Sequence, residues 1–454
     1  MKKNSRTKKE RVLILGAGVT GLAAGYASGL PVYEAQETAG GICSSYYITK
    51  TGGKKTQNSP KNNGAYHFEV GGGHWIFGGD PVVLKLINDL APCKTYARRA
   101  SIYLPDENVF VPYPIQNHLR FLKPETRDRA LLEMTENSRR ENIIRTMAEW
   151  LEASFGKTLC DLFFHPFHRM YTAGLWKEIA PQDSYKSPVD LKLAVKGARE
   201  KSNAVGYNTT FIYPERGLNT LVTGLTKKQK IHYGKKVSRI DVGKKIIYFE
   251  KGTPVNYTKI ISTLPLSKTM ALTGLSVDER AHPSPAILVL NIGASVGPRC
   301  PKDHWVYIPK SRSGFHRVGF YSNVDQSFLP QRERGKNTKV SIYVEKAYTE
   351  GKILDEEMLA RYTQETVAEL QNWGWIKGVD VVDPTWIDVA YTWSWPNSKW
   401  KEKALKTLED QSIYQVGRFG RWLFQGISDS IREGLAAGAA FNPVRSRGHD
   451  LRKS

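Results

Sequence analysis

The segment from Arg11 to Glu34 reads RVLILGAGVTGLAAGYASGLPVYE, and the rest of the chain can be placed relative to it. Its apolar run, Val12–Leu15, is short enough for a buried parallel strand and ends at glycines spaced G-x-G-x-x-G, which are Gly16, Gly18 and Gly21. The first glycine permits a tight turn, the second lets the backbone approach a pyrophosphate, and the third lets the following helix pack closely on the strand. The N-terminus of that helix would present N–H groups and a positive dipole end to the phosphates. The spacing therefore predicts a dinucleotide-binding corner.

An acidic residue ends the second predicted strand. Glu34 follows Val32 and Tyr33, at the position where a carboxylate accepts hydrogen bonds from adenosine ribose hydroxyls. Glycines at this spacing also occur at purely structural β-turn-α corners, but the strand, the helix and the acid together favour dinucleotide binding. Gly40 and Gly41 then complete an E-A-x-x-x-x-G-G continuation, which resembles the fingerprint of FAD-dependent oxidoreductases rather than of NAD dehydrogenases. We expect FAD as the cofactor.

Length and composition set broad limits. A chain of 454 residues is expected to form two or three lobes, and a hydrophobic content of 40% makes general disorder implausible. No apolar run approaches the roughly 18 residues that span a bilayer, and the basic N-terminus lacks a signal-peptide core, so we expect a cytoplasmic protein. The four cysteines are widely separated without a C-x-x-C pair, which indicates a reducing compartment and no metal site.

The formal net charge of +22 has two interpretations. One is an anionic partner, such as a nucleotide diphosphate or an acidic membrane surface, and the other is a well-solvated surface with basic tails at residues 1–11 and 445–454. No nucleic-acid-binding module is recognisable, so we expect no nucleic-acid partner. The sequence does not indicate an oligomeric state.

The order of the predicted elements indicates an α/β fold. We expect a Rossmann-type FAD-binding domain in three pieces (1–95, 205–284 and 405–454), a sheet start with an inserted helical lobe (96–204) and an antiparallel-sheet substrate domain (285–404). Within these parts the periodicity predicts helices at 125–136, 140–155, 159–170 and 355–372, and strands at 102–104, 109–111, 286–293, 305–308, 317–321, 340–345 and 386–391.

Three consecutive glycines, Gly71–Gly73, precede His74. Such a run implies a backbone pressed against something flat, for which the cofactor is the obvious candidate. Gly73 and His74 are therefore expected near the flavin ring, with a buried core histidine as the alternative.

Near the C-terminus, a predicted strand leads into Gly417 and Arg418, which we expect to contact the cofactor. Ser428, Asp429 and Ser430 are then predicted to cap a closing helix that begins at Ile431, and the start of that helix would face the flavin.

Several stretches together resemble one family. The segments GAGVTGL, EAQETAGG, FEVGGGHWIF, VPYPIQN, DHWVYIPKSRSGFHRVGFYSN and QVGRFGRWLF are similar to the flavin-dependent UDP-galactopyranose mutases, particularly their eukaryotic branch, within the superfamily of amine oxidases and protoporphyrinogen oxidases. The resemblance runs from residue 11 to about residue 440. It implies an isomerase that interconverts the pyranose and furanose forms of a nucleoside-diphosphate sugar, with N5 of reduced FAD as the nucleophile.

The resemblance also implies site residues. His74 would lie beside the flavin, Arg317 would bind the substrate diphosphate as the second catalytic residue, and the other substrate contacts would be Tyr113, Gln116, Tyr307, Trp395 and Phe424. The chain also departs from the family pattern at several places. Trp395 and Phe424 replace family tyrosines, Ser428 replaces an asparagine, and the second diphosphate-binding arginine is missing, with Arg169 and Lys177 as candidate replacements.

Two other functions stay open. One is an FAD-dependent oxidase or dehydrogenase of the amine oxidase or protoporphyrinogen oxidase type, for which no lysine can be assigned beside the flavin. The other is a flavoprotein that serves only as a binding component. NAD(P)H is a candidate reductant if the reduced flavin is the active form.

Overall fold

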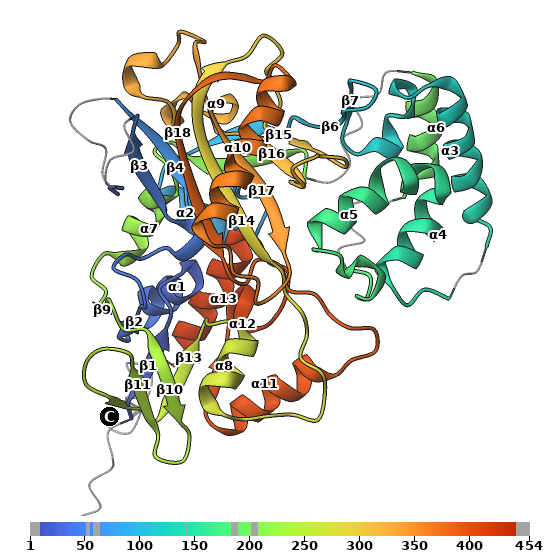
Figure 1. Ribbon diagram of the computed structural model, residues 1–454. Coiled ribbons are helices and arrows are strands. Elements are labelled where there is room, and N and C mark those ends of the chain that lie inside the picture. The colour runs from blue at the N-terminus through green and yellow to red at the C-terminus, as the bar shows by residue number, and fades with distance from the viewer. Residues whose placement is uncertain are drawn as a thin grey trace, which may run out of the picture.

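The computed structural model describes residues 10–50, 55–57, 64–140, 143–182, 189–200 and 208–441. In Figure 1 the described chain forms three parts: a parallel sheet with its helices, a larger sheet that adjoins it, and a helical lobe set to one side. The predicted α/β fold with a Rossmann-type domain is confirmed.

The parallel sheet contains five strands and carries the glycine-rich corner. In spatial order they are β19 (Ile413–Gln415), β13 (Lys259–Ser262), β1 (Val12–Leu15), β2 (Val32–Tyr33) and β9 (Ile231–His232). Val12 and Ile14 face one hydrophobic core, while Leu13 and Leu15 face another. Because both faces are covered, β1 is a continuous apolar run without polar alternation.

Each face of this sheet has its own cover. One face packs on α1 (Val19–Ser28), α7 (Leu218–Thr226) and α13 (Ile427–Ala440). The other packs on α8 (Leu266–Thr273), α11 (Trp400–Asp410) and a small antiparallel sheet of β10 (Val237–Asp241), β11 (Ile246–Phe249) and β12 (Val255–Asn256).

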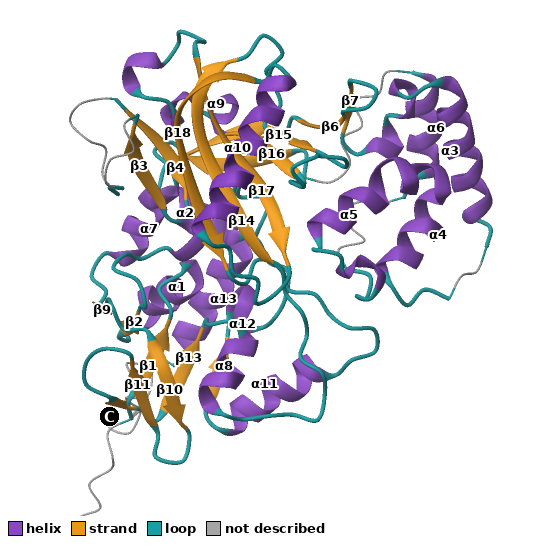
Figure 2. Cartoon of the chain, viewed as in Figure 1, coloured by secondary structure: helices purple, strands orange, loops and turns teal. Residues whose placement is uncertain are grey.

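The second sheet has seven strands and forms the upper part of Figure 2. In spatial order they are β18 (Ile376–Ile387), β14 (Ala286–Val296), β17 (Lys339–Tyr348), β16 (Arg317–Phe320), β15 (Trp305–Tyr307), β6 (Ala100–Leu104) and β7 (Val109–Pro112). All neighbours are antiparallel except β15 and β6. The helix α10 (Glu356–Asn372) packs against this sheet through Tyr362 and Leu370.

Two smaller strand pairs and one helix complete this side of the molecule. The hairpin of β3 (Ser45–Thr49) and β4 (Ala65–Glu69) hydrogen-bonds to the edge strand β18, where Tyr46 donates to Asp383 and Tyr66 donates to Asp380. The helix α2 (Pro81–Leu90) leads into β5 (Cys93–Ala97), which pairs with β8 (Thr210–Pro214).

The helical lobe leaves the second sheet after β7. It contains α3 (Pro124–Asn137), α4 (Met147–Leu159), a π-helical turn (Cys160–Phe164), α5 (His165–Tyr171) and α6 (Leu191–Arg199). Its core is rich in aromatic rings, and Phe155 stacks on Phe164 with 4.0 Å between ring centroids. The lobe therefore has a hydrophobic core of its own.

Some elements differ from the sequence expectations. The helix expected at 140–155 begins at Met147, because Thr146 and Glu149 form a reciprocal capping box there. The strand expected at 386–391 is wrong, since β18 covers Ile376–Ile387 and includes Pro384, which an edge strand tolerates. The helix α11 was not predicted.

The expected cap of the closing helix is also wrong. The helix α13 begins at Ile427 after Gly426, and no side chain caps it. Ser428, Asp429 and Ser430 therefore lie within its first turn. The sequence also predicts a polar insert at residues 49–65, TKTGGKKTQNSPKNNGA, which lies partly outside the described residues.

The helices α1 and α13 approach backbone to backbone. A Cβ on Gly434 would overlap the carbonyl oxygen of Thr20, and a Cβ on Gly438 would overlap that of Ala24. Any larger residue at these two positions would push the helices apart, and the start of α13 would move with them.

We predict that Gly438→Ala lowers the free energy of unfolding by about 1–3 kcal/mol, because the added methyl group overpacks this contact. Gly378→Ala in β18 is the matched control, since a Cβ there has no atom within 4 Å, and its effect should stay within about 0.5 kcal/mol. Urea denaturation of both variants measures the difference. Equal effects would contradict the backbone contact.

Candidate functional site

A cavity of about 760 Å³ lies where the parallel sheet, the second sheet and the helical lobe meet. The glycine-rich corner after β1 forms one end of it, and residues of α4 and α5 form another wall. A crevice outside the carboxyl ends of parallel strands is where open α/β sheets bind their ligands.

The glycine corner fits a dinucleotide. Gly16 has a φ of +94°, and a Cβ on Gly21 would overlap the carbonyl oxygen of Gly16, so the third glycine seats α1 on the strand. A Cβ on Gly18 would have no atom within 4 Å, and Gly18 lines the cavity. Open space at this one position is what a pyrophosphate needs to reach the backbone. Gly40 and Gly41 line the same end of the cavity.

Glu34 stands next to this corner at the end of β2. Its carboxylate accepts hydrogen bonds from the main-chain N–H groups of Ala17 (2.6 Å) and Gln36 (2.9 Å), and its side chain is buried. These bonds hold the turn after β1. Neither Glu34 nor Gly21 belongs to the cavity lining, so a ribose contact of Glu34 stays a prediction.

The C-terminal segment closes the opposite side of the corner. Gly417 and Arg418, in the short helix α12 (Gly417–Gly420), line the cavity together with Asp429 and Ser430 of the first turn of α13. Ser428 is turned away, and its hydroxyl donates to the carbonyl oxygen of Gly78 at 3.1 Å. The start of α13 therefore faces the cavity.

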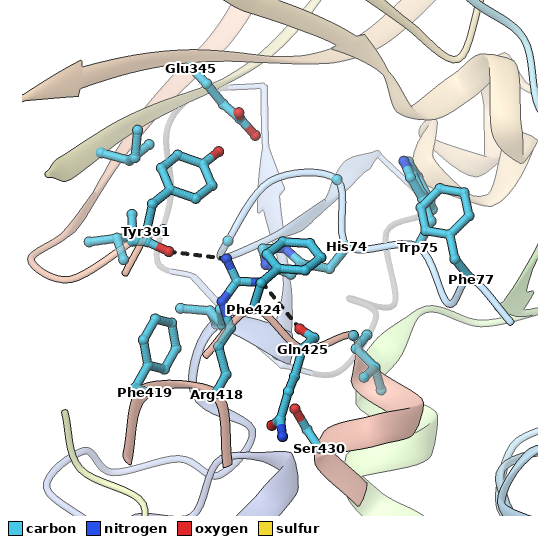
Figure 3. Close-up of a pocket in the computed structure, with 18 of the residues that line it drawn as sticks. His74, Trp75, Phe77, Glu345, Tyr391, Arg418, Phe419, Phe424, Gln425 and Ser430 are labelled. Atoms are coloured by element: carbon cyan, nitrogen blue, oxygen red, sulfur yellow. Dashed lines mark hydrogen bonds between the residues drawn. The ribbon is translucent and has the colours of Figure 1, made fainter. Parts of the chain in front are cut away.

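Arg418 places a positive charge inside the cavity. Its Nη1 and Nη2 atoms donate to the main-chain oxygens of Gln425 (3.2 Å) and Ala390 (3.4 Å), as Figure 3 shows. The ring of Phe424 lies over its guanidinium group, with 4.6 Å to the ring centroid. Carbonyl oxygens orient the guanidinium group but do not neutralise it.

His74 lies beside Arg418 and lines the cavity. Burial lowers the pKa of His74 to about 4, and the charge of Arg418 adds to this effect. The imidazole is therefore neutral at physiological pH. Contact within the protein explains why residue 73, directly before His74, is a glycine. A Cβ on Gly73 would overlap the hydroxyl of Tyr343.

Arg317 is held by a buried carboxylate. It faces Glu345 across the β16–β17 ladder, and its Nε and Nη2 atoms donate to the two carboxylate oxygens at 2.8 and 2.7 Å. Burial raises the pKa of Glu345, but the charge and hydrogen bonds of Arg317, together with the imidazole of His316 at 3.5 Å, outweigh burial and keep that pKa below its usual value. The pair lines the cavity as a salt bridge with no net charge.

Aromatic rings surround this salt bridge. Tyr113 and Tyr307 lie 4.8 Å apart between ring centroids, and Phe167 of the lobe meets Tyr307 edge-on at 5.4 Å. Tyr171, also from the lobe, packs on Tyr391 at 4.6 Å. These five residues line the cavity and join the lobe to the second sheet.

Two predicted substrate contacts lie elsewhere. Gln116 is fully buried in the 3₁₀ turn Ile115–Asn117 and is outside the cavity lining. The indole N–H of Trp395 donates to the carbonyl oxygen of Ala281 at 2.8 Å, and Arg280 stacks on its ring. Trp393, two residues earlier, lines the cavity instead.

The cationic side chains that line the cavity are not all the ones that the sequence predicts. Neither Arg169 nor Lys177 lines the cavity, but Arg98 does. Among the described residues of the lining, the cationic side chains are Arg98, Arg317 and Arg418, and none is a lysine.

Several lining residues were not predicted from the sequence, among them Arg98, Glu345, Tyr391 and Trp393. Glu345 had a usable signal, because it is the charged residue of the predicted strand 340–345. Tyr391 had no such signal at the end of the strand predicted at 386–391, and Trp393 lay just beyond that strand.

Comparison with known proteins gives the family. The model of the flavin containing amine oxidoreductases matches residues 23–417, which is most of the chain. The protein belongs to this family. Membership of this family indicates that the chain binds a flavin, FAD, and the fit of the glycine corner to a dinucleotide agrees with this.

Several solved structures share the fold of this flavin containing amine oxidoreductase. A reduced UDP-galactopyranose mutase matches with a TM-score of 0.81 at 21% identity, over 94% of each chain. A putative protoporphyrinogen oxidase from Exiguobacterium sp. 255-15 matches with a TM-score of 0.66 at 14% identity, over 95% of this chain and 97% of that one. A fatty acid isomerase that produces CLA, from P. acnes, has a TM-score of 0.58 at 13% identity and covers 96% and 100%.

Other features of the described residues limit the chemistry. Cys43, Cys93, Cys160 and Cys300 are all free thiols, and burial raises the pKa of Cys43 to about 12. No group of three or more potential metal ligands occurs in the described part of the chain, and none of its helices is long and apolar enough to cross a membrane.

We predict that Gly18→Ala weakens FAD binding at least tenfold, because its methyl group would occupy the space in front of the backbone N–H groups. Since nothing lies within 4 Å of that methyl group, the unfolding free energy of the apoprotein should change by less than about 0.5 kcal/mol. Flavin titration and urea denaturation of the same preparation separate the two effects. A variant with normal flavin affinity would show that FAD does not approach Gly18.

We predict that Glu345→Gln costs about 3 kcal/mol of folding free energy, because it leaves the buried guanidinium group of Arg317 uncompensated. In an Arg317→Met background the same change should cost less than about 1 kcal/mol, since no buried charge remains to be paired. Chemical denaturation of the four proteins of this cycle measures the coupling. Additive effects would mean that the two charges act independently.

Proposed function

We propose that this flavoprotein interconverts the pyranose and furanose forms of a nucleoside-diphosphate sugar. The proposal rests on one observation: Arg317, Tyr113 and Tyr307 line the same cavity as the glycine corner. The resemblance to the mutase family assigns the diphosphate contact to this wall. The fold shared with a reduced UDP-galactopyranose mutase supports the same proposal.

The side chains present suit such a substrate. Bound reduced FAD would supply N5 as the nucleophile. Arg418 contributes a positive charge next to His74 that forms no ion pair among the described residues, and a neutral His74 can exchange hydrogen bonds without adding charge. Tyrosine hydroxyls at Tyr113 and Tyr307 can donate to phosphate oxygens, and the aromatic wall excludes water from the reacting sugar.

The absence of lysine from the described cavity lining supports this reaction over amine oxidation. Amine oxidases commonly place a lysine beside the flavin. In the isomerisation the flavin has the same oxidation state before and after turnover, so the reaction consumes no oxygen. The flavin must nevertheless be reduced first, and we propose NAD(P)H as the reductant.

A second candidate is an FAD-dependent oxidase or dehydrogenase. The observation that favours it is the salt bridge of Arg317 with Glu345, which reduces the positive charge that the wall offers to a diphosphate. Phe424, which stacks on Arg418, also lacks the hydroxyl that the mutase family has at this position. Such an enzyme would reduce its flavin with an amine or a hydrogen-rich ring as the donor.

One experiment separates the two candidates. The holoenzyme is reduced with dithionite under argon and incubated with a panel of nucleoside-diphosphate sugars, and the ring forms are separated by chromatography. In parallel, the oxidised holoenzyme is mixed with amines while oxygen uptake is recorded. Ring interconversion without oxygen uptake supports the mutase, whereas oxygen uptake without interconversion establishes the oxidase.

We predict that Tyr307→Phe lowers kcat/KM of the isomerisation about 10- to 100-fold, because it deletes one hydroxyl donor to a charged phosphate group. Tyr414→Phe in β19 is the matched control, because Tyr414 packs on Phe441 outside the cavity lining, and kcat/KM should not change. Steady-state kinetics with the best sugar of the panel gives the comparison. An unchanged kcat/KM for Tyr307→Phe would remove this hydroxyl from the site.

A further inference from the structure

One face of α6 is made of cations. Lys192, Lys196 and Arg199 are exposed and lie at positions i, i+4 and i+7, so they share one side of the helix. The buried side of α6 consists of Ala194, Gly197 and Ala198. We call the three cations the α6 basic face.

The segment before α3 extends this face. A Cβ on Gly197 would overlap the carbonyl oxygen of Asn117, so α6 sits directly on the 3₁₀ turn that ends there. In the next turn Arg120 donates to the carbonyl oxygen of Arg199 at 3.4 Å. Lys123, three residues after Arg120, is also exposed. Five cations therefore belong to one continuous part of the lobe surface.

Few acids lie on α6 itself. Asp190 is used as the helix cap, where its carboxylate accepts from the N–H group of Leu193 at 3.1 Å. Glu107 lies 3.8 Å from Lys123. The remaining acid of this helix and its ends is Glu200, directly after Arg199.

Apolar side chains are exposed beside the cations. Phe121, between Arg120 and Lys123, is 37% exposed, and Val189, just before α6, is 42% exposed. Cations next to an exposed aromatic ring and an exposed aliphatic residue are the composition of protein surfaces that lie on lipid headgroups.

The α6 basic face is also connected to the cavity. Gln182, which precedes α6 along the chain, and Asn208, which follows it, both line the cavity. In Figure 1, α6 lies in the lobe, away from the parallel sheet.

We propose that the helical lobe docks on membranes rich in anionic lipids through the α6 basic face, with Phe121 and Val189 at the headgroup level. Each lysine or arginine near such a surface strengthens attachment, and an aromatic ring at the headgroup boundary adds to it. A phosphate-rich polymer would use the cations but gain nothing from the exposed apolar side chains. The proposal goes beyond the reaction and holds for either candidate enzyme.

The test is co-sedimentation of the flavin-loaded full chain with vesicles. Vesicles of phosphatidylcholine alone are compared with vesicles that also contain phosphatidylglycerol, at low and at physiological salt. We expect binding to the anionic vesicles only, with weaker binding at the higher salt concentration. No binding to anionic vesicles at low salt overturns the proposal.

Matched variants locate the surface. Lys192→Ala/Lys196→Ala should lower the partition coefficient about 30-fold, because it removes two cations from the docking face. Lys244→Ala/Lys251→Ala removes two exposed cations at the β10–β11 sheet and should leave partition within about threefold of the wild type. Equal losses in both double variants would mean that net charge alone drives binding, which overturns the proposal.

A third variant tests the apolar part. Phe121→Ser keeps every charge and should still lower partition several-fold, whereas binding to heparin should not change. If Phe121→Ser partitions like the wild type and heparin competes fully with vesicles, the face is a polyanion site and the membrane proposal fails. Flavin content and the unfolding midpoint of each variant show that the fold is intact.

Discussion

The position of helix α1 is the constraint on which the rest of this structure depends. Its start is seated on β1 by the contact of Gly21 with the carbonyl oxygen of Gly16, and its opposite side touches α13 at Gly434 and Gly438. A side chain at any of these places would separate backbones that now touch. Because α1 is fixed from both sides, the first turns of α1 and α13 are aimed at the same cavity. The cofactor corner is thus made by the two ends of the chain together, which is why a segment some four hundred residues from β1 contributes to it.

Two of the three arginines that line the described cavity, Arg317 and Arg418, have different electrostatic roles. Arg317 shares its charge with Glu345, and the salt bridge between them contributes rigidity and hydrogen-bonding direction more than net charge. Arg418 is oriented by two carbonyl oxygens and a phenyl ring, so its charge acts on whatever occupies the cavity. The pKa of His74 reflects this charge, since burial and Arg418 both disfavour the imidazolium. An anionic ligand or a reduced flavin would therefore be stabilised mainly from the side of Arg418.

Much of the fold could be predicted from the sequence because its signals are local. The G-x-G-x-x-G corner and the short hairpin before Pro112 depend on residues close in the chain, and the structure contains both of these elements. The start of α4 at Met147 also has a local signal, because Thr146 and Glu149 form a capping box there. The partner of Arg317 could not be predicted, because it is set by the register of β16 against β17. The position of Trp395 could not be predicted either, because its indole N–H donates to the carbonyl oxygen of Ala281, more than a hundred residues away in the chain.

The shared fold does not choose between isomerisation and oxidation, since the solved structures that match include both kinds of enzyme. The choice must lie in side chains that the reacting group meets. In this chain the polar side chains of the lining include three arginines, several tyrosines, three histidines and the acids Glu345 and Asp429, without a lysine among the described residues of the lining. Such a set binds and orients an oxygen-rich anion more readily than it accepts a proton from a substrate amine. The neutral salt bridge at Arg317 weakens that preference for anions, while the charge of Arg418 maintains it. In the proposed isomerisation, the balance between these two arginines would therefore favour a phosphorylated substrate.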